Sequence, residues 1–195
     1  MAAIGKVFDY SVPPRFAGAV RVGTLVRVDL HGRRVGGWVV EEGRAPDGRR
    51  LRPIARVTGW GPPPELIELA RWAAWRWSGP VSSFLGTASP LGAVRSLPVR
   101  PGPPPAPAFT VGAGGPAGVV AEALSRRGAV LRLPPAADVF PVVAAAAARG
   151  PALVLAPSAG DAALLAGRLA RAGAAVALLP REWAKARAGG CSAVG

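Results

Sequence analysis

Alternating apolar and polar residues in the first third of the chain predict short β-strands joined by turns. In the first strand Arg27 and Asp29 share one face, and valine and leucine side chains share the other. Three strands are expected, over residues 24–30, 35–40 and 51–57. Pro53 indicates that the third strand lies at a sheet edge or begins late, and residues 45–48 carry a turn signal. Short strands with frequent turns favour a small antiparallel β-barrel or a β-sandwich.

A helix packed on this β-domain is predicted over residues 65–77, directly after three consecutive prolines. Its apolar stripe consists of Leu66, Leu69, Ala70, Ala73 and Trp77. The stripe places Trp77 in the core. Trp72 and Trp75 lie on an adjacent face, where packing on the barrel or on a neighbouring domain is favoured over stacking on a base. A second, short helix is expected over residues 81–85.

A segment rich in proline and glycine, residues 99–116, predicts a linker between two domains, residues 1–98 and 117–195. The second domain alternates helical and apolar strand patterns, which predicts a parallel α/β unit. Helices are expected over residues 117–126, 138–149, 159–172 and 181–188, and strands over residues 129–133, 152–156, 175–179 and 191–194. The pattern stops within the sheet, so we expect an incomplete unit and a truncated or fragmentary chain. The fold class is therefore α+β with more than one domain.

The charge of the chain indicates its class of partner. It contains 24 Lys and Arg but only 11 Asp and Glu, which gives a formal net charge of +13. Such an excess favours a polyanionic partner, above all nucleic acid. The chain has one Cys and one His, which excludes an intrachain disulfide, a cysteine-based zinc site and a metal site built on several imidazoles. Neither a signal peptide nor a membrane span is recognisable, so we expect a cytoplasmic, nucleoid-associated protein without a membrane partner.

Catalytic patterns are missing from the sequence. The turn over residues 133–138 has no Gly, Lys, Ser or Thr, and the glycines of residues 112–118 lack dinucleotide-binding spacing and follow no strand. His31 fits a polar turn, Glu41 a solvated strand end, and Cys191 an inert buried thiol. We therefore expect no enzymatic activity and no bound cofactor or metal ion.

The basic residues of the first domain form two clusters, one in the predicted hairpin and one before the third strand. Both suit phosphate, because the arginine fork can bind two oxygens. The expected phosphate contacts are Arg33, Arg34, Arg49 and Arg50. Phe8 and Tyr10 flank Asp9, and aromatic and arginine side chains on a small β-domain are typical of a surface that binds single strands or strand ends. The alternative interpretation is a solvated face with Phe8 in the core.

The order of these segments resembles the N-terminal domain of the PriA family of primosomal replication-restart proteins (primosomal protein N′). The resemblance rests on FDYSVP at residues 8–13, VGTLVRV at 22–28, GRRVGGWVV at 32–40, LRPI at 51–54 and ELARWAA at 68–74. It covers residues 6–98. In the second domain, residues 152–157 resemble a strand of the family's helicase core, and residues 182–189 resemble its later Trp-centred helix.

The resemblance implies a domain that captures the 3′ end of the nascent leading strand at a stalled fork. Its pocket residues correspond to Phe8, Asp9, Gly32 and Arg52, with Tyr10 beside them and Arg52 in place of the family's Lys. In these roles Phe8 walls in the terminal sugar and base, and Asp9 accepts a hydrogen bond from the 3′-OH or a base N–H. Gly32 permits close backbone approach, and Arg52 holds the preceding phosphate.

The chain also departs from the family. The nucleotide-binding loop expected near residues 130–140 is absent, and the proline-rich linker stands where the winged-helix domain is expected. The family's zinc-binding cysteines and later helicase motifs are expected beyond residue 195. The resemblance thus implies a helicase-deficient member that binds neither the zinc nor the ATP of the full-length family. Its expected partners are forked DNA with a free 3′ end, the single-stranded DNA-binding protein and primosome proteins. The alternatives are a fragment of an ATP-dependent 3′–5′ DNA helicase and a basic RNA- or ribosome-binding barrel protein.

Overall fold

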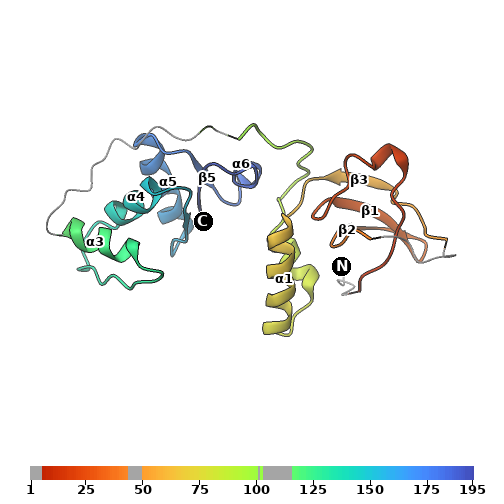
Figure 1. Ribbon diagram of the computed structural model, residues 1–195, viewed down its shortest axis with the longest axis horizontal. Coiled ribbons are helices and arrows are strands. Elements are labelled where there is room, and N and C mark those ends of the chain that lie inside the picture. The colour runs from red at the N-terminus through yellow and green to blue at the C-terminus, as the bar shows by residue number, and fades with distance from the viewer. Residues whose placement is uncertain (1–5, 44–49, 101, 103–115) are drawn as a thin grey trace. The chain divides into compact units, whose positions relative to one another are not determined.

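The computed structural model describes residues 6–43, 50–100, 102 and 116–195 (Figure 1). The chain divides into two compact units, residues 1–97 and residues 98–195. The turn expected over residues 45–48 and most of the expected linker lie outside the described residues. None of the described helices combines the length and apolar character that crossing a membrane requires.

A three-stranded antiparallel sheet forms the centre of the first unit, in the order β2-β1-β3. Its strands are β1 (Leu25–Leu30), β2 (Arg33–Trp38) and β3 (Arg56–Gly59). Leu30 pairs with Arg33, which leaves only His31 and Gly32 in the turn between β1 and β2. Both turn residues have positive φ, 48° and 77°. This is the conformation that a tight two-residue hairpin requires, so the predicted hairpin and the turn position of His31 are confirmed.

One face of the sheet carries the core of the strands. Val26 and Val28 of β1 are buried with Ile54. The short 3₁₀ helix η1 (Pro14–Phe16) contributes Phe16 to the side chains around them. The partly buried side chains packed against this core are Tyr10, Phe16, Val20, Val35, Val39 and Val57. Because successive strand residues alternate, Arg27 and Asp29 face away from the core. The alternation predicted from the sequence for β1 is therefore confirmed.

Two expectations for this sheet are wrong. The third strand begins at Arg56 and not at residue 51, which is the late start that Pro53 allowed, because a proline has no N–H for the ladder with β1. The preceding segment instead pairs with the N-terminal segment through one parallel bridge between Ser11 and Pro53. In the described residues the sheet stays open and forms neither a closed barrel nor a sandwich, because three strands of four to six residues are too few to close on themselves.

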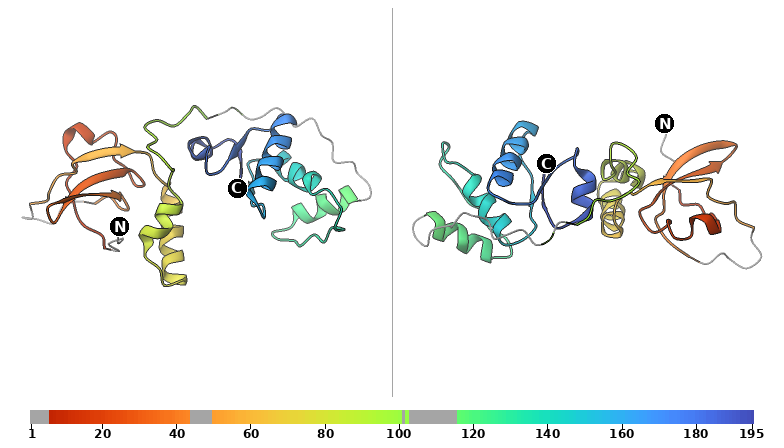
Figure 2. Two further views of the ribbon diagram at one scale, coloured as in Figure 1. Left: turned by 180° about the vertical axis from the view of Figure 1, so that it is seen from behind. Right: turned by 90° about the horizontal axis from the view of Figure 1, so that it is seen from above.

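Two helices, α1 (Pro64–Arg76) and α2 (Val81–Thr87), run side by side in every view (Figures 1 and 2). They bury Ile67, Ala70 and Leu85, with Trp38 of β2 packed against this cluster. The Trp38 indole N–H donates to Ser89 Oγ at 2.8 Å, which ties the end of the sheet to the residues after α2. The helix pair is thereby fixed to β2.

The buried face of α1 differs from the predicted stripe. Ile67 and three alanines are buried, whereas Leu69 is 53% exposed and Trp77 is 60% exposed. The prediction that Trp77 lies in the core is wrong. Ala70 packs with Leu85 of α2 in the cluster. Trp77 lies at the surface, where it contacts Trp72 edge to face at 5.3 Å and stacks on Phe84 of α2 at 6.3 Å between centroids. Trp75 is 76% exposed.

The second unit contains a three-stranded parallel sheet in the order β4-β6-β5. Its strands are β4 (Leu153–Val154), β5 (Val176–Leu178) and β6 (Ser192–Val194), and its helices are α3 (Pro116–Ser125), α4 (Phe140–Ala148), α5 (Ala159–Arg171) and α6 (Trp183–Ala188). Leu169 of α5 and Val194 of β6 are fully buried in its core. The predicted alternation of helices with parallel strands is confirmed, and the chain as a whole is mixed α and β.

One predicted strand of this unit does not form. Residues 129–133 have no strand partner in the described part of the chain, and Val130 is 97% exposed. Pro134 and Pro135 follow directly and lack the N–H donors that a ladder needs. A short apolar run is therefore an insufficient signal for a strand here.

Ile67 offers a test of the packing of the first unit, because its side chain is fully buried between the helices. Ile67→Ala should lower the free energy of unfolding of residues 1–97 by about 2–5 kcal/mol. Leu69→Ala, on the exposed side of the same helix, should change it by less than about 0.5 kcal/mol. Urea unfolding followed by tryptophan fluorescence measures both, because every tryptophan except Trp183 lies in this unit. Equal losses would contradict the packing of α1.

Asp138 offers a pH test in the second unit. The two terminal guanidinium nitrogens of Arg168, Nη1 and Nη2, donate to its carboxylate at 2.8 and 2.6 Å, and the Phe140 backbone N–H donates at 3.0 Å. These bonds lower the pKa of Asp138 from 3.8 to about 2. Because the folded pKa is depressed, its stabilising contribution is present above about pH 4 and is lost as the pH falls through 2. A carboxyl NMR titration should show a midpoint near 2, and Arg168→Gln should raise it. An unchanged midpoint would rule out this ion pair.

Candidate nucleic-acid interface

The N-terminal segment of the first unit lies beside both the β1–β2 hairpin and Arg52. The Tyr10 hydroxyl donates to the backbone oxygen of Asp29 at 3.2 Å. Ser11 N–H donates to the Arg52 oxygen, and Ile54 N–H donates to the Ser11 oxygen, both at 2.9 Å. These bonds bring the backbone of the Phe8–Tyr10 segment, the hairpin and Arg52 into one neighbourhood of the fold.

Exposure decides which of these side chains can meet a ligand. Phe8 is 42% exposed, and Asp9 and Arg52 are also exposed. Tyr10 is half-buried, with its ring against the core of the strands, so its structural role is to anchor the segment. Phe8 does not belong to that core cluster. The aromatic ring and the acidic residue that precede the anchor are therefore exposed at the surface.

The hairpin contributes backbone and charge. A Cβ on Gly32 would meet no atom within 4 Å, so space alone does not require glycine there, whereas its φ of 77° does. Arg33 and Arg34 are neighbours in β2 and therefore point to opposite faces of the sheet. Arg34 Nε lies 3.3 Å from Asp29 Oδ1 on the outer face. Arg33 and Arg34 therefore contribute to two different surfaces of the sheet.

The second predicted cluster is described only in part. Arg50 is exposed at the start of the segment that leads to Arg52. Arg49 lies outside the described residues. The phosphate contacts assigned to these two arginines stay predictions.

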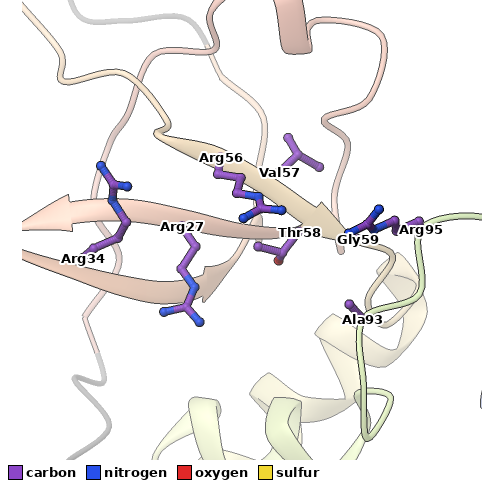
Figure 3. Close-up of a pocket in the computed structure, with 8 residues that line it drawn as sticks. All are labelled: Arg27, Arg34, Arg56, Val57, Thr58, Gly59, Ala93 and Arg95. Atoms are coloured by element: carbon purple, nitrogen blue, oxygen red, sulfur yellow. The ribbon is translucent and has the colours of Figure 1, made fainter.

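Four arginines that the sequence analysis did not group lie together on the outer face of the sheet (Figure 3). We call this surface the arginine face; its members are Arg27, Arg34, Arg56 and Arg95. They line a groove of about 750 Å³. Alternation predicts that Arg27 faces away from the core. Which residue of β3 lies beside Arg27 depends on the register of the two strands, which the sequence does not reveal. Arg95 reaches the groove because Trp60 N–H donates to the Val94 oxygen at 2.7 Å.

Residues 1–90 match the family model of the PriA 3′DNA-binding domain (3′BD). The matched residues, called the 3′BD below, contain the whole antiparallel sheet, α1 and α2. The resemblance of the N-terminal segments to the PriA family is confirmed, while the resemblance of residues 152–157 and 182–189 to a helicase core stays a prediction. No curated protein matches the chain.

Outside the 3′BD, the single cysteine has no features of a reactive thiol. Cys191 is buried, and burial raises the pKa of its thiol, which disfavours the thiolate. Among the described residues, no three His, Cys, Asp or Glu side chains cluster as a metal site would require.

Proposed function

We propose that this protein recognises the free 3′ end of a nascent DNA strand at forked DNA during replication restart, and that it has no helicase activity of its own. The match of residues 1–90 to the PriA 3′DNA-binding domain carries the proposal. It is supported by the neighbourhood of the Phe8–Tyr10 segment, the hairpin and Arg52. Forked DNA, the single-stranded DNA-binding protein and primosome proteins are its proposed partners.

A carboxylate in a domain of net positive charge gives this site its selectivity. Asp9 accepts a hydrogen bond from a terminal 3′-OH, which only a strand end presents. At an internal position the same carboxylate meets a phosphate and repels it. Phe8 offers a ring face to the terminal base, and Arg52 binds the phosphate one nucleotide before the end. Together these roles favour an end over the interior of a strand.

Asp9→Ala should separate end recognition from general attraction to DNA. Loss of a hydrogen bond to a charged group costs about 1.5–3 kcal/mol, so affinity for a fork ending in 3′-OH should fall about tenfold to a hundredfold. Affinity for the same fork ending in 3′-phosphate should stay equal or rise. Fluorescence anisotropy at several salt concentrations measures both.

Glu65→Ala is the matched control, because it removes one exposed carboxylate from the start of α1 in the same unit. It should leave the preference for 3′-OH unchanged. If the unsubstituted protein binds both forks equally and Asp9→Ala changes neither affinity, the end-recognition proposal is wrong.

Two other functions are separated by direct assays. An ATP-dependent helicase needs a phosphate-binding loop, and residues 133–138 contain no Gly, Lys, Ser or Thr to build one. We therefore expect no ATP hydrolysis above background, with or without forked DNA, in a phosphate-release assay of the purified chain. DNA-stimulated hydrolysis would overturn this part of the proposal. A general RNA-binding protein would show no preference for DNA 3′ ends.

A further inference from the structure

The arginine face concentrates like charges, and in the described residues only one of its four arginines has an acidic partner. Arg27 of β1 lies directly opposite Arg56 of β3 in the register of the sheet. Like charges directly opposite each other on neighbouring strands destabilise a sheet. In the described residues neither Arg27, Arg56 nor Arg95 has a carboxylate within ion-pair distance, and Arg34 has only Asp29. This arrangement does not stabilise the fold, whereas it would stabilise a complex with a bound polyanion.

β2 adds no bulk beside Arg27 on the outer face of the sheet. Gly36 of β2 lies directly opposite Arg27 and has no side chain. A Cβ there would meet no atom within 4 Å. At the other end of the groove, Gly59 must be glycine, because its Cβ would lie 2.5 Å from the Val94 oxygen. This close approach holds the segment that carries Arg95 against the end of β3.

The groove continues to an aromatic side chain. A second hollow of about 240 Å³ shares Val57, Gly59 and Arg95 with the groove. It is lined by Trp60 and by Arg21, whose guanidinium carbon lies 4.4 Å from the centroid of the Trp60 ring. A positively charged groove that leads to an aromatic ring with a stacked arginine is typical of surfaces that bind single-stranded nucleic acid.

We propose that the arginine face binds the sugar–phosphate backbone of a single DNA strand, as a site separate from the one proposed for the 3′ terminus. The two sites use opposite faces of β1, since Tyr10 packs on the side of Val26 and Val28 and Arg27 projects from the other. Cross-strand neighbours lie about 5 Å apart, so side chains from β2, β1 and β3 offer successive contacts to a strand that crosses the sheet. This site needs no strand end.

The double variant Arg27→Gln/Arg56→Gln tests the arginine face in the full chain. The probe is a fluorescein-labelled oligothymidylate with a 3′-phosphate, which removes the terminal hydroxyl from consideration. Affinity should fall at least about tenfold, and the slope of log affinity against log salt should fall by about 1.4, because about 0.7 counterion is released for each single-strand phosphate contact. The ratio of affinities for 3′-OH and 3′-phosphate ends should not change.

The matched control is Arg15→Gln/Arg76→Gln, which removes the same charge from η1 and α1, where each arginine lies over an aromatic ring. It should lower affinity and salt slope by clearly less. Urea unfolding verifies that the Arg27/Arg56 variant folds, and Arg95→Gln, outside the strands, provides a test of the same groove if it does not. That single variant should reduce the salt slope by about 0.7.

Three results would overturn the proposal. The first is a folded Arg27→Gln/Arg56→Gln variant that binds the oligothymidylate with the affinity and the salt slope of the unsubstituted protein. Another is a loss no larger than that of the control variant. The third is an equal loss for a blunt hairpin duplex, which would show a general duplex contact in place of a single-strand path. Asp9→Ala reports on the 3′-OH preference alone, so failure at one site is distinguishable from failure at the other.

Discussion

The alternation of side chains along β1 is the constraint on which the first unit depends. β1 is the central strand, so its register with β2 and β3 fixes what lies on both faces of the sheet. Val26 and Val28 hold the core on one face, and Arg27 and Asp29 are thereby forced onto the other. A shift by one residue would exchange the two faces and bury charge. Core formation and the presentation of Arg27 are thus one event.

The N-terminal segment depends on that same sheet for its position. It belongs to no strand and is held by the half-buried ring of Tyr10, by the Tyr10 bond to Asp29 and by the Ser11 bridge to Pro53. These attachments leave Phe8 and Asp9 exposed just before the anchor. In the described residues one half-buried ring and a few hydrogen bonds therefore hold the segment that carries Phe8 and Asp9.

The sequence was sufficient for features that local rules decide. The hairpin followed from alternation around His31 and Gly32. The residues assigned to the 3′ end came from the resemblance of ordered segments to the PriA family, and that assignment stays a prediction. Properties set by tertiary packing were not predictable. The buried side of α1 depends on which face α2 covers, so alanines replaced Trp77 in the core. The pairing of Arg27 with Arg56 depends on where Pro53 lets β3 begin.

The basic residues at the edge of the sheet also affect whether two molecules associate. In the described residues β2 pairs with another strand on one side only, and it contains Gly36 and Gly37, which offer little bulk to keep a second copy away. Unpaired edges invite sheets of different molecules to join, and charge on the edge opposes this. Arg33 and Arg34 at the start of β2 make two such edges repel each other. These arginines thus also oppose self-association, and neutralising them would favour aggregation independently of any loss of binding.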